Sequence, residues 1–183
     1  MPKILIPLAN GFEEIEAVNM IDVLRRADIE VIIAGVGGKR VEGGHHIVIE
    51  AECLICDVDS DELDMIILPG GWGGTKVLAE DAQVQALLKE MDAKKKMIGA
   101  ICAAPFALNK AGVLKPNYTC YPSVEKDIEL EGYRQDKKVV VDQNVMTSRG
   151  PGTAICFALS VVQRFKGEQI AERLRKNMLV EPC

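Results

Sequence analysis

Short apolar runs that alternate with helical patterns are the feature that most constrains this sequence. Residues 3–9 and 30–35 are apolar runs, and apolar residues recur at helical spacing over residues 14–27 between them. Because parallel strands need a crossover connection, this stretch predicts a strand–helix–strand unit. Two further apolar runs, at residues 65–68 and 97–101, extend the same alternation. The chain is therefore predicted to be a doubly wound α/β protein with a mostly parallel central sheet and helices on both faces.

Turn residues and spacing place the other expected elements. These are a hairpin near residues 41–50, helices at 81–95, 103–111, 153–165 and 168–177, a strand at 118–121 and a hairpin at 139–148. The strand at 65–68 is expected to end in a glycine-rich turn at Gly70 and Gly71. No repeat, low-complexity segment or linker interrupts the pattern, so residues 1–183 are expected to form one domain.

Net charge and the lengths of the apolar runs exclude several classes of partner. The net charge is -5 with no basic stripe, which argues against nucleic acid. No apolar run approaches the roughly 20 residues needed to span a bilayer, so no membrane association is expected. The first residues lack the apolar region and cleavage site of a signal peptide, and we expect a cytoplasmic protein.

The six cysteines are too scattered for a disulfide framework in a chain of 183 residues. Cys53 and Cys56 have metal-ligand spacing, but no second pair or histidine cluster completes a zinc site. No metal is therefore expected, and these two are interpreted as incidental. Cys156 lies among apolar residues of an expected helix and is interpreted as a core residue.

Cys102 has a different setting. It stands between the apolar run at 97–101 and a small-residue helical segment, the position of a nucleophile elbow. A helix N-terminus offers free N–H groups and a dipole that favour a thiolate. The alternative is a buried, inert cysteine, which is the usual fate of a free thiol.

Two neighbouring features favour the functional interpretation. Backbone N–H groups at Gly70 and Gly71 are suited to stabilise a developing oxyanion, since glycine lets the backbone approach a ligand closely. Glu13 and Glu14 lie where acidic residues complement a helix dipole, but Glu16 is one turn further in. A carboxyl group that is pushed into the interior has a raised pKa, and beside a thiolate it can give and take protons. The two groups would then titrate as a unit.

Four segments together resemble the ThiJ/PfpI superfamily, in the branch that holds the Parkinson-associated protein deglycase and the bacterial ThiJ-like proteins. They are Gly11-Phe-Glu-Glu-Ile-Glu16, Leu68-Pro-Gly-Gly71, Ala100-Ile-Cys-Ala-Ala-Pro105 and Thr147-Ser-Arg-Gly-Pro-Gly-Thr153. The resemblance runs over nearly the whole chain and implies a flavodoxin-like fold. It also implies a homodimer with the first helix in the interface, which agrees with the wide apolar stripe on that helix.

The resemblance assigns roles residue by residue. Cys102 matches an oxidisable nucleophile, and Glu16 matches the acid that hydrogen-bonds its sulfur. Gly71 and Ala103 match positions whose N–H groups face the site. The pocket is expected to be lined by Glu13, His45, Gly70, Tyr121 and Pro151.

The sequence also departs from the family pattern. Tyr121 stands where many members have a histidine, and a tyrosine hydroxyl is a poor base near neutral pH, so Glu16 is the expected proton carrier. Cys120 is expected to point away from Tyr121 and is not expected to be a resolving thiol.

His45 matches an arginine that in some relatives reaches the partner's pocket, with a plain exposed histidine as the alternative. Ala103 replaces the histidine of the related peptidases, and no downstream His–Glu pair fits an amidotransferase.

Two functions are compatible with these residues. The first is cofactor-independent removal of reactive dicarbonyls, of the glyoxalase or protein deglycase type, through a Cys102 hemithioacetal with Glu16 as proton shuttle. Small dicarbonyls or glycated molecules would be the substrates. The alternative is an oxidative-stress sensor or chaperone that acts through a Cys102 sulfinate, with little turnover.

Overall fold

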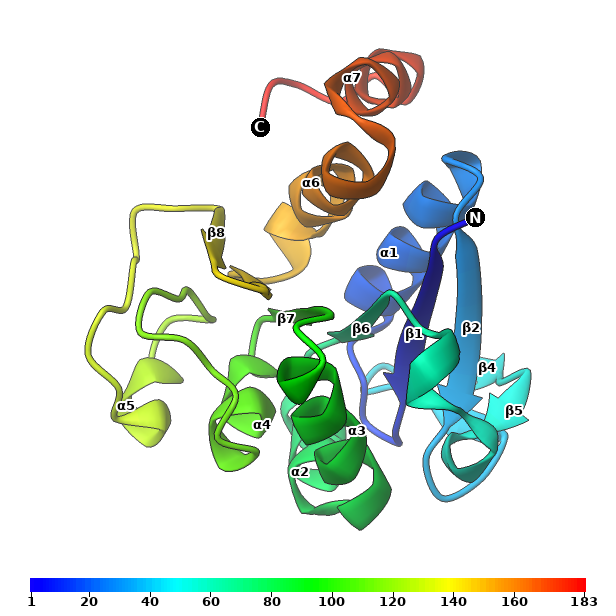
Figure 1. Ribbon diagram of the computed structural model, residues 1–183, viewed down its shortest axis with the longest axis vertical. Helices are drawn as coiled ribbons and strands as arrows, with labels where there is room; N and C mark the ends of the chain where they lie inside the picture. The colour runs from blue at the N-terminus through cyan, green and yellow to red at the C-terminus, as the bar shows by residue number, and fades with distance from the viewer.

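The computed structural model describes residues 1–183 and contains one large sheet with helices on both faces (Figure 1). The sheet has seven strands in the order β5-β2-β1-β6-β7-β9-β8. All neighbours are parallel except β8 and β9, which form an antiparallel hairpin at one edge. The strands are β1 (Lys3–Leu8), β2 (Glu30–Gly35), β5 (Cys53–Leu54), β6 (Met65–Leu68), β7 (Met97–Ile101), β8 (Val139–Asp142) and β9 (Val145–Ser148).

The helices are divided between the two faces of the sheet, as Figure 1 shows. One face carries α1 (Glu14–Arg26), α6 (Ala154–Lys166) and α7 (Glu168–Asn177), and the other carries α2 (Trp72–Glu80), α3 (Ala82–Ala93) and α4 (Pro105–Lys110). Smaller elements complete the chain. They are a separate hairpin of β3 (Arg40–Glu42) and β4 (Val48–Glu50), a short α5 (Glu125–Ile128), and 3₁₀ turns at Ile55–Asp57, Ser60–Glu62 and Pro151–Thr153.

The core is split by the sheet. A cluster of 28 buried residues fills the face under α1, α6 and α7, and one of 21 fills the face under α3 and α4. All residues of β6 and β7 are buried, as expected of central strands covered on both sides. The predicted flavodoxin-like α/β fold is confirmed.

One helix was not predicted and one predicted strand is wrong. The turn expected at Gly70 and Gly71 is present, but α2 begins directly after it, at Trp72. Its glycines are needed for close packing: a Cβ on Gly74 would lie 2.9 Å from the Phe12 backbone nitrogen. The strand expected at 118–121 is absent apart from an isolated bridge at Tyr118. Both edges of β9 are already paired, so the Thr119 N–H donates to a side chain, Thr147 Oγ1, at 2.9 Å.

One cysteine interpretation is also corrected. Cys156 is buried, but it forms a disulfide with Cys183 and so joins α6 to the C-terminal tail. The sequence could not predict this disulfide, because 27 positions separate the two cysteines and their pairing depends on how the C-terminal tail folds back over α6. The other four cysteines are free. No helix combines the length and the apolar character needed to cross a membrane.

Candidate active site

Three loops meet where the strand order reverses. The chain begins in the middle of the sheet, runs outward from β1 to β2 and then returns to β6 on the other side of β1. The loops after β1, β6 and β7 therefore share the carboxyl edge of the sheet, where open α/β folds bind ligands. The Glu13 N–H donates to the Gly70 carbonyl oxygen at 2.9 Å and ties the first two loops together.

Cys102 occupies a strained turn directly after β7. Its φ is +64°, in the left-handed region that non-glycine residues seldom adopt, at a cost of about 1–3 kcal/mol. Two backbone hydrogen bonds hold it there: the Cys102 N–H donates to the Ser148 carbonyl oxygen at 3.0 Å, and its own carbonyl accepts from the Tyr121 N–H at 2.8 Å. The predicted nucleophile elbow is present in the backbone.

Glu16 lies in α1, fully buried beneath this turn. Its Oε2 accepts the Gly70 N–H at 2.7 Å, and its Oε1 has no hydrogen-bond partner. Burial raises the pKa of Glu16 to about 7, partly offset by the Gly70 N–H and the Cys102 side chain. A carboxyl group with that pKa is balanced between accepting and donating a proton near neutral pH.

Gly70 explains how Glu16 and Cys102 approach each other. A Cβ at this position would lie 2.5 Å from Cys102 Cβ and 2.6 Å from Glu16 Oε2. Only a residue without a side chain leaves room for the sulfur and the carboxyl group to face each other across the loop.

The Cys102 thiol is not the low-pKa thiolate that the helix N-terminus led us to expect. Burial, and then the negative charge of Glu16, raise the pKa of Cys102 to about 12, against the N–H groups of Gly71 and Ala103. Helix α4 begins only at Pro105 and has six residues, so its dipole does not overcome burial.

The raised pKa describes Cys102 opposite an ionised Glu16. Between the two pKa values, about 7 and about 12, the pair holds a single proton. When that proton moves to Glu16, the charge opposite the sulfur disappears and two backbone N–H groups remain to stabilise the thiolate. The pair can therefore release a nucleophile by internal proton transfer.

A pocket of ≈ 470 Å³ opens over Cys102. Six of its lining residues are among those predicted: Glu13, Gly71, Cys102, Ala103, Tyr121 and Pro151. Glu16 and Gly70 lie behind its floor. Four lining residues were missed, namely Trp72, Ser123, Val124 and Asp127. Trp72 directly follows Gly70 and Gly71, so its position in the pocket could have been predicted from the sequence. The other three come from the region of α5, and no sequence pattern indicates that this region packs near the end of β7.

Tyr121 and Cys120 are separated as expected, although they do not lie in a strand. Tyr121 is 49% exposed and lines the pocket, and its ring lies close to Gly150. Cys120 is fully buried and does not line the pocket, and burial raises its pKa to about 12.

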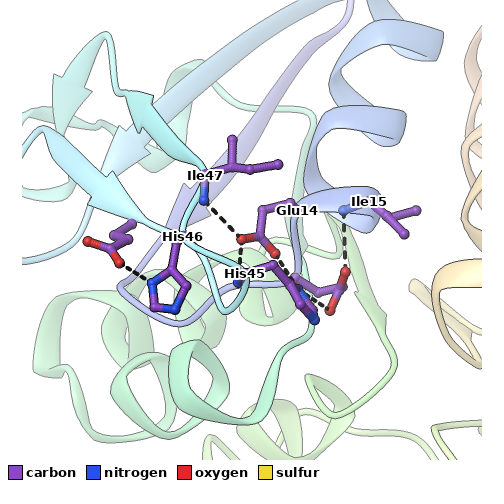
Figure 2. Close-up of polar contacts among 7 residues, drawn as sticks. Glu14, Ile15, His45, His46 and Ile47 are labelled. Carbon is purple, nitrogen blue, oxygen red and sulfur yellow. Dashed lines mark hydrogen bonds and ion pairs between the residues drawn. The ribbon is translucent and has the colours of Figure 1, made fainter.

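His45 does not line the pocket. Figure 2 shows its ring directed at the Glu14 carboxylate, and Nδ1 lies 2.9 Å from Glu14 Oε2 and 3.7 Å from Glu13 Oε2. Glu14 also accepts the N–H groups of His45 and Ile47. The hydrogen bond to Glu14 raises the pKa of His45 and lowers that of Glu14, although burial opposes the latter. The side chains of Glu13, Glu14 and His45 therefore interact with one another, and these contacts anchor the β3–β4 hairpin to α1.

The fold and the site define a flavodoxin-like α/β protein with a cysteine on a nucleophile elbow and a buried glutamic acid beside it. A family model described as the DJ-1/PfpI family matches residues 2–164, and the chain belongs to that family.

Curated relatives and solved structures support the same family assignment. The protein dj-1beta of Drosophila melanogaster is 40% identical over 179 residues, which cover 96% of each chain. The glutathione-independent glyoxalase DJR-1.2 of Caenorhabditis elegans is 37% identical, covering 98% of this chain and 93% of that one. The crystal structure of Drosophila DJ-1beta superposes with a TM-score of 0.95 at 38% identity, covering 99% of each chain. That of oxidised Toxoplasma gondii DJ-1 has a TM-score of 0.92 at 33% identity over the full length of both.

Proposed function

We propose that this protein converts small dicarbonyls such as methylglyoxal to hydroxy acids without a cofactor, with Cys102 as nucleophile and Glu16 as proton carrier. The observation that carries the proposal is the buried Glu16 carboxyl group, which faces Cys102 under a pocket and has a pKa of about 7. One relative is named a glutathione-independent glyoxalase, which supports the same class of reaction.

The first step forms a carbon–sulfur bond. The Cys102 sulfur attacks the aldehyde carbon while Glu16 takes the thiol proton and returns it to the carbonyl oxygen, which gives a hemithioacetal. The N–H groups of Gly71 and Ala103, which face the sulfur, are suited to stabilise the oxygen while it is negative.

The second step moves a proton between adjacent carbons. Glu16 removes the proton from the sulfur-bearing carbon, giving an enediol, and delivers a proton to the neighbouring carbon. The product is a thioester of a hydroxy acid, and water hydrolyses it to lactate and the free thiol. The aldehyde carbon is oxidised and the ketone carbon reduced, so no outside oxidant or reductant is required.

The test is to incubate the protein with methylglyoxal and follow both substrate loss and lactate formation. Cys102→Ala should abolish lactate production, a loss of at least about a thousandfold. Cys120→Ala is the matched control and should change turnover by less than about twofold, since its side chain does not reach the pocket. Substrate loss without lactate, or equal loss of lactate in both variants, would overturn the proposal.

A second candidate is an oxidation sensor. A relative of known structure is described as oxidised DJ-1, and the same Gly71 and Ala103 N–H groups with a protonated Glu16 are suited to hold a sulfinate. Release of carbonyl adducts from glycated molecules is a third activity, which free dicarbonyl removal can mimic because early adducts dissociate spontaneously.

We also propose that the chain forms a homodimer through α1. Ile15 and Val18 are large apolar side chains on α1 and are 58% and 48% exposed, and Ile47 on the neighbouring hairpin loop is 55% exposed. The Asn19 Oδ1 atom beside them is buried without a hydrogen-bond partner. Val18→Asp should shift the molecular mass in light scattering from two chains to one; a single chain in the wild type would contradict the proposal.

A further inference from the structure

The pocket over Cys102 carries two carboxylates and no cationic side chain. Glu13 contributes one from the N-cap of α1, and Asp127 contributes the other from α5. The remaining lining residues are neutral, with Trp72, Val124 and Pro151 among them. A ligand that reaches the sulfur therefore passes two negative charges.

The two carboxylates differ in how much of their charge is neutralised. Glu13 accepts the Ile15 N–H at 3.4 Å and lies 3.7 Å from the exposed ring of His45. The Asp127 side chain forms no hydrogen bond or ion pair with any residue of the chain. Asp127 is exposed, and its carboxylate lines the mouth of the pocket without an opposing partner.

Three cationic residues that neighbour pocket residues do not line the pocket themselves. Lys76 Nζ lies 5.6 Å from the centre of the Trp72 ring and packs against it, and Lys126 neighbours Asp127 in α5. Arg149 donates to the Gln135 carbonyl oxygen and faces Tyr133. None of these three residues is part of the pocket wall.

We propose that Asp127, with Glu13, is a specificity-determining residue that makes the Cys102 pocket favour neutral and cationic carbonyl compounds and reject anionic ones. The choice of carbonyl compounds as ligands rests on the proposed function, whereas the selection by charge does not. An aldehyde carried next to an ammonium or guanidinium group would be attracted, whereas one that carries a carboxylate or phosphate would be repelled.

An ordinary structural role for Asp127 makes a different prediction. Acidic residues in the first turn of a helix complement its dipole, and Asp127 lies in the first turn of α5. In that case Asp127→Asn would change stability slightly and leave charge selection at Cys102 unaltered.

The experiment uses two thiol reagents that differ in charge. The full-length protein is treated with a cationic trimethylammonium methanethiosulfonate or with an anionic sulfonate analogue, and the rate at Cys102 is read by peptide mass. Peptide mapping is needed because two other cysteines are also free and accessible, Cys53 being half-buried and Cys56 exposed. The two rates are compared with those of a short cysteine peptide to remove intrinsic reactivity.

The wild type should favour the cationic reagent, and Asp127→Asn should reduce the cation-to-anion rate ratio roughly five- to tenfold, with Asp127→Lys reducing it further. The control is Glu80→Gln, an exposed change of the same net charge at the other end of α2 from Trp72. It should leave the ratio unchanged. High salt should shrink the wild-type preference.

An unchanged ratio in Asp127→Asn, or an equal fall in Glu80→Gln, would overturn the proposal. Thiol labelling does not require turnover, so its failure and the failure of the dicarbonyl reaction are separable. If turnover is found, a trimethylammonium-substituted arylglyoxal should lose kcat/KM relative to a carboxylate-substituted one when Asp127 becomes Asn.

Discussion

Cys102 and Cys120 are two free thiols, one half-buried and one fully buried, and burial is the main reason that the pKa of each is raised to about 12. Their surroundings differ. Cys102 lies in a strained turn, lines a pocket and faces a glutamic acid whose own pKa is near 7. Cys120 is closed off from solvent and does not line the pocket over Cys102.

The comparison shows that the pKa of a thiol does not by itself decide whether it can act as a nucleophile. Access for a ligand and a nearby group that can take the proton separate these two cysteines. The following predictions test this difference, and they are arranged by their expected effect on the reactivity of Cys102.

The largest contrast should appear under mild peroxide. We expect two oxygens to add at Cys102, with Cys120 oxidised at least about a hundredfold more slowly, because exposing it requires a local opening that costs about 3 kcal/mol or more. Peptide mass spectrometry over time gives both rates. Similar oxidation rates at Cys102 and Cys120 would contradict the difference in accessibility between the two thiols. They would also argue against the oxidation-sensor function.

A smaller effect is expected from filling the space between Glu16 and Cys102. Gly70→Ala places a methyl group 2.5 Å from Cys102 Cβ, so the loop must move. We expect a loss of about 1–3 kcal/mol in the free energy of unfolding, measured in urea, and a fall in the alkylation rate of Cys102. Gly152→Ala is the control, since its added Cβ meets nothing within 4 Å. Equal effects of the two changes would contradict the close approach.

The smallest effect on Cys102 should come from removing the disulfide between Cys156 and Cys183. Replacing Cys156 and Cys183 with serine removes a bond that closes a span of 27 positions, which should lower the free energy of unfolding by about 3 kcal/mol. Turnover should change by less than about twofold, because neither residue lines the pocket over Cys102. A large loss of turnover at a temperature where the variant is folded would indicate coupling between the tail and the active site.

The sequence predicted the parts of this site that depend on local pattern. The run before Cys102 and the spacing of Glu16 within α1 were enough to bring both residues to one edge of a parallel sheet. Helix α2 was missed because Gly73 and Gly74 read as helix breakers, whereas their role is to let α2 approach the loop after β1.

Other features depend on long-range packing. Asp127 reaches the pocket only because the segment after α4 folds back over the end of β7, and no pattern in residues 118–138 indicates that path. The thiolate prediction failed for a related reason: the helix dipole is a local feature, but the burial that raises the pKa of Cys102 is a property of the whole fold. The disulfide likewise depends on the course of the C-terminal tail.

The most direct test of the proton exchange between Cys102 and Glu16 is the pH dependence of Cys102 alkylation by neutral iodoacetamide, compared in the wild type and Glu16→Gln. Below pH 7 Glu16 is protonated and the thiol keeps its proton, so alkylation should be slow; as the pH rises through about 7 the pair loses one proton and the rate should rise. In Glu16→Gln that rise should vanish, leaving only an increase toward the higher pKa of the buried thiol. A rise through pH 7 that survives in Glu16→Gln would contradict the account.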